Sequence, residues 1–88
     1  MARPIKLNGR EAGVIRAIGF GLGISGAEVQ ERMQMDGEAL VDLLNSLLDM
    51  GYIETPGMSE RVTAEGYAAE MFEVNPSYAA ILKTAIRR

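Results

Sequence analysis

The sequence predicts a small, mainly α-helical domain with one β-hairpin, in the order helix, helix, helix, hairpin, helix, helix. Three observations indicate this fold class. Apolar residues recur at helical spacing behind N-capping patterns in the first half of the chain. A Pro-Gly pair then separates two short β-type runs, and a second helical pattern follows them. The chain has 88 residues, which fits one domain over 1–88 with a modest core.

The first three predicted helices form the core, and each begins at a capping pattern. Asn8 and Glu11 have the spacing of a capping box. Ser25 and Glu28 repeat this spacing, and Asp36 is placed to cap the third helix. Apolar residues at helical spacing follow each cap. These patterns predict helices over residues 8–20, 25–35 and 36–50.

After the third helix, the sequence predicts a two-stranded hairpin, which we call the wing, and two more helices. Gly51 is placed to adopt the left-handed conformation that ends a helix. Residues 52–55 are β-type, and Pro56-Gly57 favours a turn. Residues 61–63 are the expected returning strand. The wing therefore spans residues 52–63, and the following helices are predicted over 64–74 and 76–87.

Much of the chain resembles the winged helix-turn-helix domains of transcription regulators. Residues 24–35 resemble the second helix and turn of these domains, and residues 40–53 resemble their third helix and its exit into the wing. The tetrapeptide Thr-Ala-Glu-Gly at 63–66 is similar to the start of the post-wing helix in MarR-like and PadR-like proteins. The resemblance covers roughly residues 10–74. It implies a DNA-binding regulator whose third helix enters the major groove.

The charge distribution is unusual for a DNA reader. Residues 25–54 contain seven acids and one base, a net charge of −6, whereas the whole chain carries −3. The polar face of the third helix holds three carboxylates, those of Glu38, Asp42 and Asp49, and no cation. DNA binders gain affinity when Lys and Arg replace phosphate counterions, and carboxylates repel phosphates. The predicted recognition helix is therefore atypically acidic.

Five residues are candidates for contacts with DNA or with a partner protein. Four lie on the third helix, where an amide and a hydroxyl can still read a base edge, and one lies in the wing. A solvated helix face with no binding role is the alternative interpretation. The candidates are Glu38, Asp42, Asn45, Ser46 and Arg61.

Two function classes follow from these observations. The first is a small DNA-binding regulator, and the second is a protein-protein interaction module that keeps the winged-helix fold without binding DNA. The partner of the second class would be a basic protein, because the exposed helix face is acidic. With no Cys and no His, the chain lacks the usual nucleophile–base pairs and zinc ligands. We therefore expect no enzyme activity, no metal site and no cofactor.

Assembly and location are also predicted. The last helix carries an apolar stripe after the core is largely complete, so we expect a homodimer through the C-terminal helix. The apolar stretches are too short for a membrane span, and the absence of Cys is compatible with the cytoplasm, which is the expected location. The stripe consists of Tyr78, Ile81, Leu82, Ala85 and Ile86.

Overall fold

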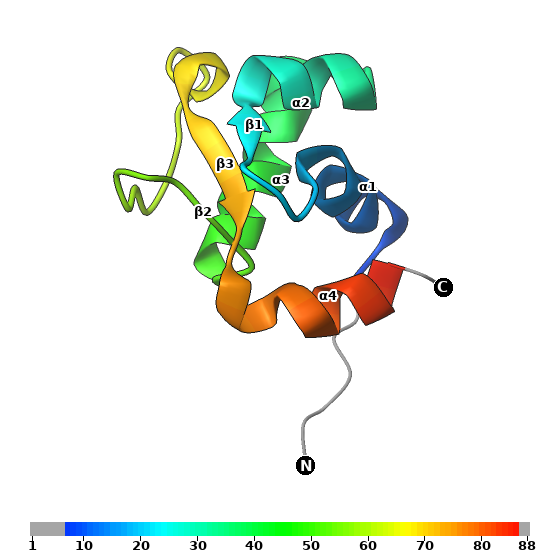
Figure 1. Cartoon of the computed structure of the whole chain (residues 1–88). Helices are drawn as coiled ribbons and strands as arrows, with labels where there is room; N and C mark the ends of the chain where they lie inside the picture. The colour runs from blue at the N-terminus through cyan, green and yellow to red at the C-terminus, as the bar shows by residue number, and fades with distance from the viewer. Residues whose placement is uncertain (1–6, 87–88) are drawn as a thin grey trace.

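The computed structural model describes residues 7–86, in which four α-helices surround a small antiparallel sheet (Figure 1). The mainly helical class is confirmed, and the arrangement is compatible with a winged-helix-like one. The helices are α1 (Gly9–Ile18), α2 (Gly26–Met33), α3 (Gly37–Asp49) and α4 (Ala79–Ile86). The strands are β1 (Ile24–Ser25), β2 (Ile53–Glu54) and β3 (Met71–Val74), and two 3-10 turns are η1 (Tyr67–Ala69) and η2 (Pro76–Tyr78).

The predicted capping residues begin the first three helices. Asn8 accepts a hydrogen bond from the backbone N–H of Glu11 at 2.8 Å, and the Glu11 carboxylate accepts one from the Asn8 N–H at 3.0 Å. Ser25 accepts from the N–H of Glu28 at 3.2 Å. The side chain of Asp36 caps α3 in the same way. Each cap satisfies a backbone N–H that lacks a partner inside its helix.

The core lies between the first three helices and the sheet. Leu44 and Leu47 of α3 are fully buried, as the helical periodicity predicts. Their apolar surroundings come from α1, α2, the sheet and α4. The fully buried residues around them include Val14, Ile15, Val29, Leu40, Phe72 and Leu82.

The strand that pairs with β2 is not the expected one. Ile53 and Glu54 pair with Val74 and Glu73 of β3, so the hairpin predicted over 52–63 does not form. The prediction of a returning strand at 61–63 is wrong, because the backbone of this segment is bonded by a side chain of α3 instead of by a strand.

The helix predicted over 64–74 is also wrong. This segment contains only the single turn η1 and then extends into β3. Phe72 and Val74 are buried while Met71 is exposed, which is the two-residue alternation of a strand. The unexpected strand β1 pairs with β3 through Ile24 and Ser25, and the sheet order is β1-β3-β2.

The C-terminal helix packs on its own domain. Asn75 accepts a hydrogen bond from the N–H of Ser77, and Pro76 occupies the first position of η2, as expected. The sequence predicts this helix over 76–87. In the structure it begins as η2 and continues as α4 to Ile86. The last predicted residue, 87, lies outside the described residues. Figure 1 shows α4 at one end of the domain near α1, and Leu82 is fully buried there.

Candidate binding face on α3

The exposed face of α3 carries two carboxylates that form no ion pair with another described residue. Glu38 and Asp42 are one helical turn apart, and both are exposed. Two ion pairs occur among residues 7–86, and neither involves Glu38 or Asp42. Asp49 is exposed further along the helix. We call these three residues the acidic face of α3.

Asn45 does not belong to this exposed face. Its side chain accepts a hydrogen bond from the backbone N–H of Val62 at 2.7 Å and donates one to the Val62 carbonyl at 3.0 Å. Asn45 is 6% exposed and Val62 is 7% exposed. The predicted exposure of Asn45 is therefore wrong, because the segment after β2 folds back and covers this side chain. Ser46 is half-buried.

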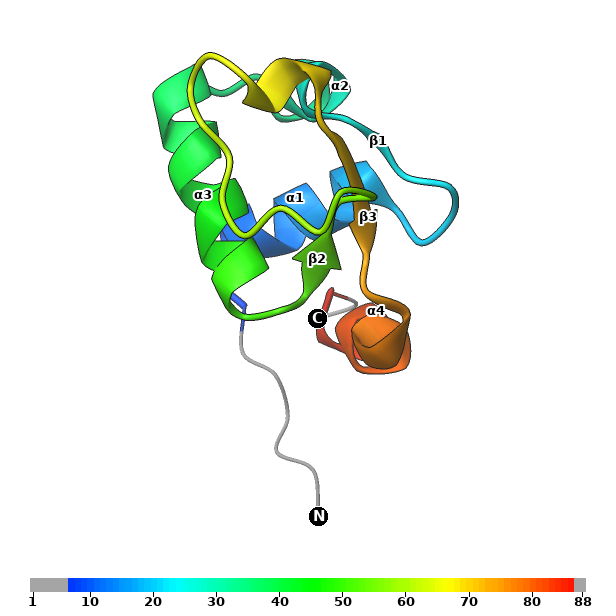
Figure 2. The same ribbon diagram turned by 90° about the vertical axis from the view of Figure 1, so that its left-hand side faces the viewer.

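Arg61 lies against the acidic face. Its guanidinium Nη1 is 3.6 Å from the Oδ2 atom of Asp49, with the two side chains 66% and 60% exposed. Figure 2 shows the segment between β2 and η1 running beside α3, which is the path that brings Arg61 to this helix. An exposed pair of this kind contributes about 0–1 kcal/mol. The predicted wing arginine therefore offsets one carboxylate of the three.

Three other cations of the described chain contact groups outside this face, whereas Arg10 lines a pocket together with Asp36 and Ala39 at the start of α3. Arg32 pairs with Glu28 at 3.8 Å and donates to the Ala17 carbonyl at 2.7 Å. Arg16 donates to the carbonyl of Ile86 in α4, and the ammonium of Lys83 lies 5.2 Å from the ring centre of Phe20. Residues 7–86 contain twelve acids and five bases, which gives a net charge of −7.

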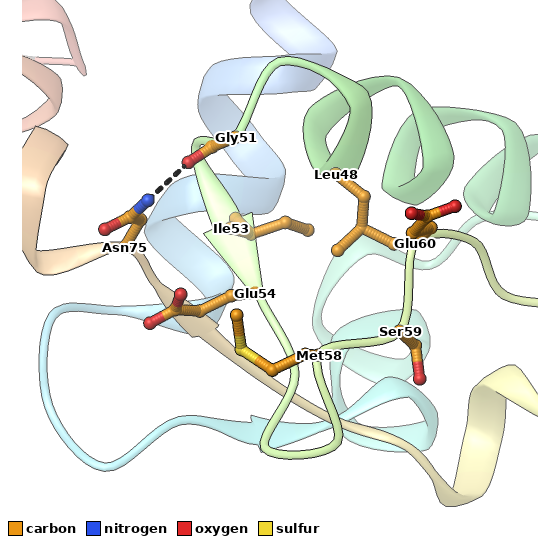
Figure 3. A pocket seen from close by; sticks show the side chains of 8 residues that line it. All are labelled: Leu48, Gly51, Ile53, Glu54, Met58, Ser59, Glu60 and Asn75. Carbon is orange, nitrogen blue, oxygen red and sulfur yellow. Dashed lines mark hydrogen bonds between the residues drawn. The ribbon is translucent and has the colours of Figure 1, made fainter.

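A shallow groove lies between the C-terminal end of α3, β2 and the turn that follows β2 (Figure 3). Its volume is about 230 Å³. The groove could not be predicted from the sequence. It brings Leu48 of α3 together with the turn after β2, and the position of that turn depends on the hydrogen bonds that Asn45 forms. The lining residues are Leu48, Gly51, Ile53, Glu54, Met58, Ser59, Glu60 and Asn75.

The turn beside the groove has an unusual backbone. The Thr55 carbonyl accepts from the N–H of Met58 at 2.9 Å, and the buried Thr55 hydroxyl accepts from the N–H of Ser59 at 2.9 Å. These bonds hold Met58 at φ 55°, a left-handed conformation that costs a non-glycine residue roughly 1–2 kcal/mol. The Met58 side chain is 73% exposed.

Within residues 7–86, no group of three or more carboxylates is arranged to hold a metal ion. The same range contains no helix with the length and apolar character needed to cross a membrane. Comparison with known proteins gives no match to a family model, a curated protein or a solved structure. Inferences about function therefore depend on the residues of this chain and their arrangement.

Proposed function

We propose that this domain is a protein-interaction module that binds a basic partner through the acidic face of α3. The observation that carries the proposal is the exposure of Glu38 and Asp42, neither of which forms an ion pair among residues 7–86. The amide best suited to read a base edge, that of Asn45, is used inside the domain. The remaining charges of this face, those of Glu38 and Asp42, are both negative. They are suited to pair with Lys and Arg side chains of a partner.

Electrostatics favours a basic protein over DNA at this face. Two like charges at 4 Å repel by about 1 kcal/mol even in water, so each approach of a carboxylate to a phosphate is unfavourable. Opposite charges on a partner surface instead speed the encounter and exclude competing partners. The net charge of −7 over residues 7–86 extends this preference beyond α3.

DNA binding is the second candidate function. It is supported by the order α1-β1-α2-α3-β2-β3 and by the sheet order β1-β3-β2, which are compatible with a winged helix. Winged helices place the third helix in the major groove. DNA contact through this helix would have to draw on Arg61 and on bases outside α3, because α3 contains no Lys or Arg.

One double variant separates the two candidates. Glu38→Gln with Asp42→Asn removes two negative charges while keeping the side-chain sizes. We expect its binding to a Lys- and Arg-rich synthetic peptide to weaken about fivefold, with slower association. Binding to a random DNA duplex should strengthen, because the repulsion is reduced. Fluorescence anisotropy and stopped-flow measurements on both probes give the two responses.

The matched control removes the same charge elsewhere. Glu65→Gln with Glu70→Gln changes two acids near η1 and leaves α3 intact. It should affect peptide binding less than the α3 variant does. Equal losses in both variants would mean that only net charge matters. Failure of the unmodified protein to bind the peptide, together with DNA binding that the α3 variant strengthens, would favour the second candidate.

A further inference from the structure

We infer that the groove of Figure 3 receives one apolar side chain of the basic partner, flanked in the partner sequence by cations. This inference rests on the proposed function, because it describes a second contact of the same partner. The groove adjoins the acidic face: Glu60, which lines it, precedes Arg61, which pairs with Asp49. A partner segment lying along α3 can therefore reach both surfaces.

The floor of the groove is apolar, and Met58 lies at its edge. Leu48 is half-buried and Ile53, at its base, is 2% exposed. Figure 3 shows the Met58 side chain folded back toward Glu54 and Ile53. The volume of about 230 Å³ is below the roughly 300–1,000 Å³ of pockets that hold drug-sized ligands. A single aliphatic side chain fits this space better than a small-molecule ligand does.

The charges around the groove indicate what flanks that side chain. The carboxylates of Glu54 and Glu60 lie on opposite sides of the apolar residues, as Figure 3 shows. The eight lining residues include no Lys or Arg. The adjacent cation, Arg61, is paired with Asp49. An incoming segment with a Lys or Arg on each side of its apolar residue therefore complements the groove in both charge and polarity.

Met58 supplies an independent reason to expect a contact here. Among the described residues, Gln34 and Met58 are the non-glycine residues with positive φ. Gln34 ends α2 in the left-handed conformation that commonly follows a helix, and the hydrogen bonds to Thr55 hold Met58 in the same region, but no backbone requirement explains why the residue there is methionine. Glycine would adopt the Met58 conformation without strain. A strained and 73% exposed methionine gives the fold little, whereas methionine is well suited to cover an irregular partner surface.

The test uses the full chain and two synthetic peptides with the same Lys and Arg content. One peptide carries a central Leu between two cations, and the other carries Ala there. The unmodified protein should prefer the Leu peptide about tenfold, which is the effect of burying the additional aliphatic carbons. Met58→Gly should remove most of this preference while keeping or raising the urea midpoint of unfolding.

Two further variants complete the design. Met71→Ala changes another exposed methionine, on β3 away from the groove lining, and should leave the preference unchanged. Glu54→Gln with Glu60→Gln should weaken both peptides to a similar extent, more at low salt than at high salt.

The outcomes distinguish this inference from the proposed function. Equal affinity for both peptides, with binding still sensitive to Glu38→Gln and Asp42→Asn, overturns the inference about the groove but supports binding through the acidic face. A Leu preference that survives Met58→Gly also overturns the groove. A lower urea midpoint for Met58→Gly would assign the methionine to the fold instead. Absence of binding to either peptide overturns both proposals.

Discussion

The amide of Asn45 uses one N–H donor and its oxygen acceptor on Val62, and these are the groups that a neighbouring strand would present to that backbone. Helical periodicity places Asn45 on the polar side of α3, and polar side chains on such a face are usually solvated. Nothing local in the sequence indicates which later segment returns to cover it. The burial of Asn45 could therefore not be predicted, whereas the exposure of Glu38 and Asp42 could.

Asn45→Ala should destabilise the domain by about 2–4 kcal/mol. The substitution leaves both the N–H and the carbonyl of the buried Val62 without partners. Ser46→Ala, at the next position of α3, is the control and should change stability by less than about 0.5 kcal/mol. Urea unfolding of the three proteins measures the difference. Equal midpoints for both variants would show that the segment around Val62 does not depend on Asn45.

At the scale of elements, local signals predicted the first three helices and the position of β2, and missed β1 and β3. Caps and apolar periodicity lie within a few residues of each helix, so the core of α1, α2 and α3 follows from them. β1 has only two residues, which is too short for a period to be visible. The alternation in β3 is short, and the alanine-rich segment before it favours a helix. The conformation of this segment is set by the pairing of β3 with β1 and β2, which is a long-range contact.

The junction of α2 with η1 gives a test of that pairing. Gly26 donates its N–H to the Glu70 carbonyl at 2.9 Å, and a Cβ at this position would overlap the carbonyl of Tyr67. Gly26→Ala should therefore cost about 1–3 kcal/mol. Gly9 is likewise the first residue of its helix, but a Cβ there meets no atom within 4 Å. Gly9→Ala should be neutral or stabilise by up to about 1 kcal/mol.

Thermal unfolding of these two variants provides the comparison. A helix over 64–74, as the sequence predicts, would give no reason for the two glycines to differ. Similar melting temperatures for Gly9→Ala and Gly26→Ala would therefore count against the close approach of η1 to α2.

At the scale of the whole molecule, the packing of α4 determines how much apolar surface remains for the predicted homodimer. Leu82 is fully buried against the domain, and Ala85 and Ile86 are half-buried. The outer side of α4 retains Ile81, which is 36% exposed. The homodimer stays a prediction, but it has less apolar surface available than the full stripe would provide. Stable interfaces bury about 1,200–2,000 Å² in total, so a pair formed through this side should be weak.

Light scattering over a concentration series tests this assembly. We expect a mass that rises from monomer toward dimer only at high micromolar concentration, and Ile81→Glu should abolish the rise. A dimer that persists at low concentration would mean that α4 contributes more surface to a partner than its packing on α1 leaves free. A monomer at every concentration would remove the homodimer prediction.

The charge of the whole molecule sets an expected limit on DNA binding. Four of the nine bases, Arg3, Lys6, Arg87 and Arg88, lie in the sequence outside the described residues, while residues 7–86 carry −7. We expect binding to random duplex DNA at physiological salt to be weaker than the ~10⁻⁴–10⁻⁶ M of typical non-specific binders, and to fall steeply as salt increases.

Arg61 and Asp49 provide the variants for this last prediction. Asp49→Asn removes the carboxylate that pairs with Arg61, so any DNA binding should strengthen; Arg61→Ala removes the cation and should weaken it. Neither change alters a buried group, so the free energy of unfolding of both proteins should stay within about 0.5 kcal/mol of that of the unmodified chain. Fluorescence anisotropy over a salt series gives the affinities. Tight, sequence-specific binding by the unmodified protein would contradict the assignment of the α3 face to a basic protein partner.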